Sequence, residues 1–578
     1  MKTFFQVFLA VFISLGIIFV GLFIILSALA QTSVNIPDHA LLQIDLQGDI
    51  AEYIAPDPVE EALGRTRLDM RKFRDNLEKA AVDDRIEAVV IRPELLGVGF
   101  GKLQEITALI HKFRRSGKKI YAYLGSDMSF TRDYYVASAC DSVFMPADAN
   151  LFLTGVRSEV TFYKDFFKKI GVNAQFLHIG KYKNAPDSYT RDKMSPYQKE
   201  VLNDIIGQYY NDIVQTISAN RGLKPVKVDQ LINQQTGFSG NKAKELGLVD
   251  GTLFYSQLEK ILAQKHPGLR RLKALDYALE PASSLHIRNK RRFAVINCVG
   301  TIYGGSEGEN PMFGKMLGAK TIIANIRKAA KARSIKAIIL RIDSPGGASL
   351  PSAALYQAIL EAKKKKPVIA SVSDLGASGG FYMAVAADEI VAAPNSLVGS
   401  IGIFAGKFTF DGTYGKLGVH VDAVQKGRHA DLFSVTEPWN KEEKAIIQNI
   451  LREFYHGFVS KVAKARHKTY EEVDRLAQGH VWTGLQAFRY GLVDTIGTFY
   501  TALSIAKQKA GIPQSESVRL VNYPRKKSLM NELLGNLGVL IDYNHRHWLA
   551  DALNRAKTIL TEWQNKPLAL LPFRLEFK

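Results

Sequence analysis

The chain has 578 residues, of which 47% are hydrophobic, so it is long and apolar enough to form two or more globular domains. Its formal charge of +20 would suit nucleic acid, an anionic membrane surface or acidic partners. The basic residues are scattered, and we find neither a zinc-ligand spacing nor an aromatic and basic RNA motif, so we expect a solvated surface and no nucleic acid. Two cysteines, Cys140 and Cys298, exclude a disulfide framework, and their apolar surroundings predict buried thiols.

The N-terminus carries a long apolar stretch, Phe4–Ala30, which contains no charged residue. It is long enough to cross a bilayer core of about 30 Å, and Lys2 before it favours a cytoplasmic N-terminus. A cleaved signal peptide is the alternative, because Ala28–Ala30 resembles a cleavage site. The stretch is longer than the roughly 7–15 apolar residues of a signal peptide. We therefore predict an uncleaved anchor over residues 1–34, with the remaining chain outside the cytoplasm.

Beyond residue 34, short apolar runs alternate with helical patterns, which indicates βαβ units and a largely parallel sheet. The same segments occur twice, in the same order, at a shift of about 250 residues. The matching pairs are LLQIDLQGDI and FAVINCVGTI, EAVVIR and KAIILR, GKKIYAYLGSD and KKPVIASVSD, YYVASACD and FYMAVAAD, and AKELGLVD and AFRYGLVD. We predict an α/β protein of two tandem repeats, residues 35–286 and 287–523.

The last segment, residues 524–578, has apolar residues near helical spacing. We predict a helical tail that packs on a neighbouring subunit, with membrane contact near the anchor as the alternative.

The two copies differ at two turns. In the second copy, SDLGASGG places Ser378 before two glycines, whereas the first copy has Thr131 there, followed by Arg132 and Asp133. The second copy also has the turn DSPGG (Asp343–Gly347), which the first copy replaces with PELLGVG. Taken alone, each turn is explained as well by a purely structural role as by a function. Together, in one copy, they favour acyl transfer, which needs an unhindered hydroxyl and amide donors beyond the carboxyl ends of the strands.

A serine nucleophile needs a base. His429 is the most plausible histidine of the second copy, although no aspartate partner is evident. The other option is a lysine that burial keeps neutral, and the first copy has Lys181 and Lys183 in GKYKNAPDSYTRDKMSP. In that case the first copy would supply the base and the second copy the nucleophile.

Three of these stretches together resemble the signal peptide peptidase A (protease IV) family in its long, duplicated, membrane-anchored form. They are SDLGASGGFYMAVAADEIVAAPNSLVGSIGIF, DSPGG and GKYKNAPDSYTRDKMSP. The resemblance covers about Leu41–Tyr523 and the anchor. It implies a fold similar to that of the Clp protease and crotonase superfamily, with two such repeats after a transmembrane helix.

The resemblance also implies site residues. Ser378 would be the nucleophile and Lys183 the general base of a Ser/Lys dyad, with Ser400 orienting the lysine and the amides of Gly346 and Gly379 forming the oxyanion hole. Each site would lie between the two repeats of one chain. Physically, a lysine sealed between two domains, with Lys181 nearby, could stay neutral. No cofactor or metal is implied.

The implied function is a membrane-anchored serine endopeptidase that degrades signal peptides left in the membrane. It would be a bowl-shaped homotetramer in the bacterial cytoplasmic (inner) membrane, with most of the chain on the periplasmic side. We keep two alternatives. One is a catalytically inactive, membrane-tethered scaffold of the same fold. The other is an acyl-CoA enzyme of the crotonase kind, which uses oxyanion turns without a serine nucleophile.

Overall fold

The fold is taken from a computed structural model, which describes residues 6–16, 19, 35–56, 66–285, 291–306, 308–310, 314–524 and 568–570. The predicted anchor lies mostly outside these residues, and of its length only the helical residues 6–16 and residue 19 are described. Within the part of the chain that the structure describes, no helix is both long and apolar enough to cross a membrane.

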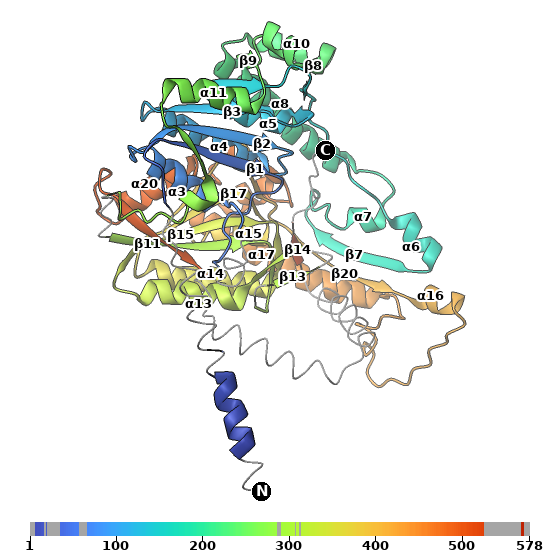
Figure 1. The fold of residues 1–578 in the computed structure, drawn as a ribbon. Coiled ribbons are helices and arrows are strands. Elements are labelled where there is room, and N and C mark those ends of the chain that lie inside the picture. The colour runs from blue at the N-terminus through green and yellow to red at the C-terminus, as the bar shows by residue number, and fades with distance from the viewer. Residues whose placement is uncertain are drawn as a thin grey trace.

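The first repeat is built on a six-stranded sheet whose strand pairs are all parallel (Figure 1). The apolar runs seen in the sequence form its central strands, where Leu42, Val89 and Ile91 are fully buried. The strand order is β10 (Arg270–Lys273), β1 (Ala40–Gln47), β2 (Ile86–Glu94), β3 (Lys119–Tyr123), β5 (Ser142–Met145) and β9 (Gly251–Thr252).

The second repeat has a corresponding sheet in the order β21 (Val481–Thr483), β19 (Leu397–Gly399), β17 (Val368–Ala377), β15 (Ile335–Ser344), β11 (Arg291–Val299) and β23 (Val518–Tyr523). Two further strands continue from β17, namely β18 (Glu389–Ala392) and β22 (Thr495–Ile496). The pairs are parallel except for β19 with β21.

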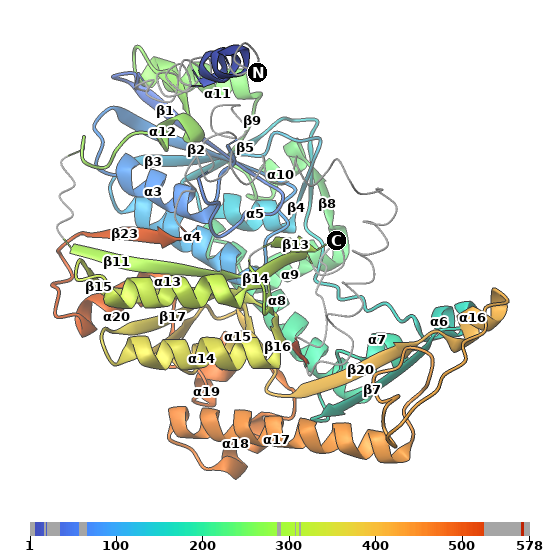
Figure 2. The same ribbon diagram turned by 90° about the horizontal axis from the view of Figure 1, so that it is seen from below.

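Helices separate and cover the two sheets (Figure 2). Helices α3 (Met70–Ala80) and α4 (Phe100–Arg114) lie between the sheets, while α13 (Ala319–Lys331) and α14 (Ser349–Lys363) cover the far face of the second sheet. Helix α11 (Tyr255–Lys265) packs on one face of the first repeat's sheet, and helix α20 (Phe499–Lys509) packs on one face of the second repeat's sheet.

Equivalent helices recur in the two repeats, as the sequence predicts. Helices α8 (Pro196–Arg221) and α17 (Lys441–Arg466) both have 26 residues, and the short helices α5 (Thr131–Ser138) and α15 (Gly379–Ala384) both follow the third large strand of their repeat. Cys140 and Cys298 are both buried and form no disulfide, which confirms that prediction. The predicted boundary between the repeats, at residues 286 and 287, lies outside the described residues.

A third sheet joins the repeats. Its order is β13 (Gly308–Asn310), β14 (Gly314–Gly318), β12 (Thr301–Tyr303), β16 (Gly346–Ala348), β24 (Leu568–Leu570), β20 (Ile403–Thr409) and β7 (Asn173–Ile179). Strand β7 of the first repeat pairs antiparallel with β20 of the second along its full length. The segment that follows β7, which contains the lysine pair, is thereby delivered to the second repeat.

The predicted helical tail is only partly described. Residues 568–570 form the strand β24 rather than a helix, because their backbone pairs with β16 and β20. Residues 525–567 and 571–578 lie outside the described part of the chain.

The interface between the repeats contains buried ion pairs. Arg341 Nε lies 2.7 Å from Glu52 Oε2, and Arg341 Nη2 lies 2.6 Å from Glu105 Oε2, with all three side chains 1–3% exposed. Both carboxylates belong to the first repeat, and Arg341 ends the apolar run of β15 in the second. Because removal of one partner of a buried ion pair costs about 3–5 kcal/mol, these contacts hold the repeats in one register.

Candidate active site

Ser378 lies in a sharp turn between β17 and α15. Its backbone has φ 55° and ψ −113°, a conformation that costs a non-glycine residue about 1–3 kcal/mol. The amide of Ser378 donates a hydrogen bond of 2.7 Å to the carbonyl of Gly399, which holds the turn. A serine forced into such a strand-to-helix turn presents its hydroxyl at the carboxyl end of the strand.

The two glycines after Ser378 allow this turn to pack on the DSPGG turn. A Cβ on Gly379 would lie 2.6 Å from Ser352 Oγ and 3.2 Å from Gly346 Cα. A Cβ on Gly380 would lie 2.7 Å from the carbonyl oxygen of Ser344. The GG pair is therefore required by close backbone approach, which explains why the two Gly-rich turns occur in the same copy.

One of the two amides expected to form the oxyanion hole has a hydrogen-bond partner within its own turn. Gly346 N donates to Ser344 Oγ at 3.2 Å, so the amide that we expected to be an oxyanion donor already has a partner. The amide nitrogen of Gly347 lies 3.2 Å from the place of a Cβ on Gly379. Gly379 is the first residue of α15, where an N–H has no partner within its own helix.

Lys183 of the first repeat reaches this turn. Its Nζ lies 2.8 Å from Ser378 Oγ, 2.9 Å from Ser400 Oγ and 3.1 Å from the carbonyl oxygen of Ser400, and all three residues are fully buried. The structure thus brings together the three side chains that the sequence singled out. Burial holds the pKa of the Lys183 amine well below its usual range, which favours the neutral form that can accept a proton.

The other residues weighed as bases, or as helpers of the base, lie elsewhere. Lys181 is exposed, with Nζ 5.0 Å from the ring centre of Tyr182, and the lowered pKa of Lys183 comes from burial rather than from the Lys181 charge that we expected to contribute. His429 Nδ1 and Nε2 lie 3.8 Å from carboxylates at the start of α17, and no contact with Ser378 is present among the described residues.

Two glycines that we did not expect from the sequence pack directly against Lys183. A Cβ on Gly479, at φ 76°, would lie 2.6 Å from Lys183 N, and a Cβ on Gly402 would lie 3.1 Å from Lys183 Cδ. The carbonyl of Gln478 accepts a 2.8 Å hydrogen bond from the amide of Tyr182. Backbone atoms of the second repeat therefore hold the lysine segment in place. Contacts of this kind do not depend on side-chain chemistry, so no sequence motif indicates them.

Ser400 is also fixed by the loop that contains Gly479. It has φ 51°, and its amide donates a 2.7 Å hydrogen bond to the carbonyl of His480. Burial lowers the pKa of His480 to about 4, so this imidazole is neutral at physiological pH. One loop of the second repeat thus positions both Lys183 and Ser400.

A strand of the chain itself lies beside the site. Leu568–Leu570 pairs antiparallel with Gly346–Ala348 of the DSPGG turn, and Leu568 also pairs with Phe404 of β20. Of the two strands that flank β24, β16 contains Gly346 and β20 begins three residues after Ser400. The site therefore has a place for one extended polypeptide segment between β16 and β20.

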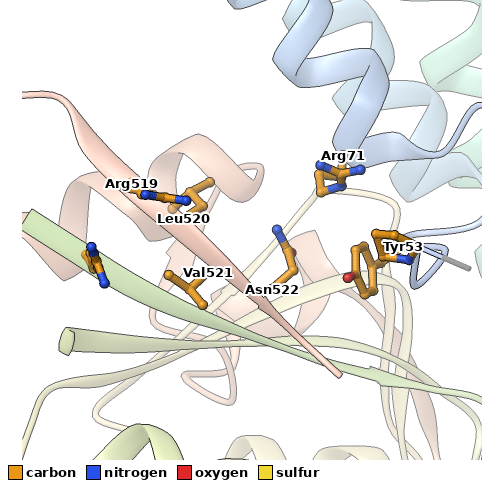
Figure 3. Close-up of a pocket in the computed structure, with 8 residues that line it drawn as sticks. Tyr53, Arg71, Arg519, Leu520, Val521 and Asn522 are labelled. Atoms are coloured by element: carbon orange, nitrogen blue, oxygen red, sulfur yellow. The ribbon is translucent and has the colours of Figure 1, made fainter. Parts of the chain in front are cut away.

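A cavity of about 400 Å³ lies in another part of the repeat interface (Figure 3). It is bounded by the edge strand β23 and, across from it, by Tyr53 and Arg71 of the first repeat. None of the residues Lys183, Ser378 and Ser400 lines it. We therefore take the Ser378 turn, and not this cavity, as the candidate active site.

Comparison with known proteins identifies the family. The model of peptidase family S49 matches residues 112–268 and 361–513, one region in each repeat, which together cover more than half of the chain. The chloroplastic serine protease SPPA of Arabidopsis thaliana is 32% identical over 508 residues, covering 86% of this chain and 73% of that protein. Protease 4 of Salmonella typhi is 32% identical over 500 residues, covering 82% and 79%.

One solved structure, the ClpP1 N165D mutant from Listeria monocytogenes, covers 37% of this chain and 95% of its own, at 15% identity and a TM-score of 0.23. The class of protein follows from the family match, which makes the chain a serine peptidase. Within that class, the chain belongs to peptidase family S49.

The close packing of Gly479 against Lys183 gives a prediction. Gly479→Ala should lower kcat for peptide hydrolysis by about 100-fold, because the added Cβ collides with the Lys183 backbone and displaces the amine by the order of 1 Å. The control is Gly511→Ala. Gly511 has a similar φ of 64°, but nothing lies within 4 Å of its Cβ position, so the backbone strain is matched without the collision. Equal activity of the two variants would contradict this role of Gly479.

Proposed function

We propose that the chain is a serine endopeptidase with a dyad formed by Ser378 and Lys183. The observation that carries the proposal is the 2.8 Å separation of Lys183 Nζ and Ser378 Oγ, with both groups fully buried. Ser400 acts on the lysine, holding its amine through the hydroxyl and carbonyl oxygens. Membership of peptidase family S49 supports the peptide bond as the bond that is cleaved.

In this mechanism the neutral Lys183 amine takes the proton of Ser378 while Oγ bonds to the substrate carbonyl carbon. The developing oxyanion is stabilised by the Gly379 amide and by an amide of the Gly346–Gly347 turn. As the C–N bond breaks, the Lys183 ammonium returns its proton to the leaving amine. Water then attacks the acyl-enzyme while Lys183 takes its proton. Lys183 returns that proton to Ser378 Oγ as the C–Oγ bond breaks and the carboxylic acid product leaves.

The substrate binds as an extended strand. Support comes from β24, which occupies the position between β16 and β20 where a peptide would complete the sheet by backbone hydrogen bonds. Strand addition fixes the peptide beside Ser378, and side chains on alternate positions give the selectivity.

The natural substrates in this proposal are signal peptides in or at the membrane. A relative from Enterococcus faecium, 29% identical over 217 residues, is named a putative signal peptide peptidase SppA. The described helix of residues 6–16 exposes apolar side chains, including Phe8 and Phe12, as a membrane anchor would. The protein would then lie in the bacterial cytoplasmic (inner) membrane, with both repeats on the periplasmic side. Membrane fractionation of the chain with and without residues 1–34 tests the anchor.

The chain assembles with copies of itself, as a homotetramer. Helices α6 (Lys164–Ile170) and α16 (Asp411–Lys416) are equivalent at a shift of 247 residues. At the same shift, the strand pair β7 and β20 has unpaired counterparts in the other copy, residues 420–426 and 156–162, neither of which forms a strand. Val421 and Val424 are 56% and 100% exposed. Pairing these two segments between neighbouring chains repeats the β7–β20 contact and covers the valines.

No observation favours an inactive scaffold or an acyl-CoA enzyme. A scaffold has no use for a neutral, buried amine beside the Ser378 hydroxyl, and a crotonase-type enzyme would leave that hydroxyl without a role.

The dyad is tested with a fluorophosphonate probe, which phosphonylates nucleophilic serines with loss of fluoride. Ser378→Ala should abolish labelling and peptide hydrolysis, and Lys183→Met should lower both by more than about 100-fold. The matched control is Lys407→Met, because Lys407 is also buried but donates to the carbonyl of Leu432. It should be labelled at the normal rate. Labelling of Ser378 at the normal rate in Lys183→Met would remove the lysine from the mechanism.

The pH dependence follows from the lowered pKa of Lys183. The labelling rate should rise with pH and level off well below the usual lysine value of about 10.4, because only the neutral amine accepts the proton. Between the folded and unfolded pKa the unfolded chain binds more protons, so burial of Lys183 costs stability at neutral pH and costs less as pH rises. Lys183→Met should therefore have an equal or greater free energy of unfolding at pH 7.

The strand-binding site is tested by shortening the chain at two points. A chain that ends at Pro567 lacks β24 and should have a lower KM for peptides, because no segment competes for the space between β16 and β20. A chain that ends at Leu570 keeps β24 and serves as the control. If the two chains have the same KM, β24 does not mark the substrate path.

The assembly is tested by a disulfide in the expected register. Lys407 pairs with Gln175 in β20 and β7, so the 247-residue shift pairs Val160 with Asp422 of the next chain. The double variant Val160→Cys with Asp422→Cys should form covalent oligomers on oxidation, and Val160→Cys alone should not form a ladder. The native cysteines are buried and do not interfere. Light scattering then gives the number of subunits, and a monomer would contradict the proposal.

A further inference from the structure

Two carboxylates lie at the start of the two turns that build the site. Asp343 is three residues before Gly346, and Asp374 is four residues before Ser378. Their side chains are only 11% and 13% exposed. Oδ1 of Asp343 accepts a 3.1 Å hydrogen bond from the amide of Leu375, so the two turns are already connected within the second repeat.

Lys102 of the first repeat reaches both carboxylates. Its Nζ lies 2.7 Å from Asp343 Oδ2 and 3.3 Å from Asp374 Oδ2, and its side chain is 6% exposed. The carboxylate of Asp374 also accepts hydrogen bonds from the amides of Gly99, at 3.0 Å, and Lys102, at 2.8 Å, which caps the start of α4. Helix α4 is thus fastened to the starts of both turns at once.

This cluster is confined to the copy that has the complete site. Strands β2 and β15 are equivalent at a shift of 249 residues, which places Glu94 opposite Asp343 and Pro351 opposite Lys102. Proline cannot supply an ammonium group, and the carboxylate of Glu94 instead accepts hydrogen bonds from Ser126 and Gln47. A contact needed only to maintain the repeated fold would be expected in both copies.

The positive charge of Lys102 offsets the mutual repulsion of the buried carboxylates around it. Burial acts to lower the pKa of Lys102, but Asp343, Asp374 and Glu52 outweigh burial and raise it well above the usual range, so the amine is charged. Burial raises the pKa of Asp343, and the neighbouring Asp374 and Glu52 charges act in the same direction while Lys102 opposes them. Without the lysine, the carboxylates repel one another directly beneath the two turns.

We propose that Lys102 is a positioning residue, which holds the Gly346 turn and the Ser378 turn in register by binding Asp343 and Asp374. The inference rests on the proposed dyad, because it assigns Lys102 a part in orienting that site. Lys102 does not touch the reacting atoms. It acts through the two carboxylates, and through them the first repeat contributes to the oxyanion side of the site as well as supplying the base.

The test compares kcat, KM and the pH profile of full-length variants. Lys102→Met should lower kcat by about 10- to 100-fold, since small displacements of the turns are enough, and should change KM by less than about threefold. Its activity should also fall as pH rises through the raised carboxylate pKa, which gives a bell-shaped profile in place of the wild-type rise to a plateau. A purely structural loss would not create this falling limb.

Two further variants keep the result interpretable. Lys102→Met with Asp343→Asn removes one charge of each sign and should recover part of kcat and lose the falling limb. Lys79→Met is the matched control, because Lys79 is also buried in the first repeat but binds the carbonyls of Tyr277 and Glu280, away from the site. Its kcat should stay within about twofold of wild type. If Lys102→Met does not fold, the double variant Lys102→Met with Asp343→Asn is compared with the single variant Asp343→Asn. The single variant should then have a lower kcat than the wild type.

The inference is overturned if Lys102→Met has wild-type kcat, if Lys79→Met loses as much, or if the double variant shows the product of the two single losses. In the event that Lys102→Met does not fold, wild-type kcat in Asp343→Asn overturns it. Failure of the dyad proposal has a different signature, since Ser378→Ala would then remain active whatever Lys102 does.

Discussion

The 2.8 Å contact between Lys183 Nζ and Ser378 Oγ is the interaction on which the rest of the structure depends. An amine can serve as a base near neutral pH when burial lowers its pKa, and the two repeats together bury the Lys183 amine completely. The paired strands β7 and β20, the tightly packed loop at Gly479 and the ion pairs of Arg341 all maintain that closure.

The closure has a price in local conformation. Ser378 and Ser400 both have positive φ, and the glycines around them approach backbone atoms to within contact distance. Each strained residue costs about 1–3 kcal/mol and persists only when its surroundings fix it. Here the surroundings are the carbonyls of Gly399 and His480, which accept the amides of Ser378 and Ser400.

Much of this could be predicted from the sequence, because it depends on patterns with a fixed period or a fixed order. The apolar runs gave the central strands, and comparison of the copies singled out Ser378 and its glycines. The packing of Gly479 against Lys183 could not be predicted, because it is a backbone contact between distant segments. The hydrogen bond from Gly346 N to Ser344 Oγ is local, but it depends on a side-chain rotamer that no sequence pattern specifies. The strand at Leu568–Leu570 was also missed, since its pairing depends on partners about 160 to 220 residues earlier in the chain rather than on its own composition.

The exchange of strands between the repeats has an evolutionary consequence. In the proposed dyad, a gene fragment encoding only the rear half would retain the Ser378 alcohol but would lack the Lys183 amine. A fragment encoding only the front half would make a lysine that has nothing to deprotonate. With the dyad divided in this way, deletion of either repeat would remove one of its two groups, so the proposed mechanism requires that the two repeats be kept together.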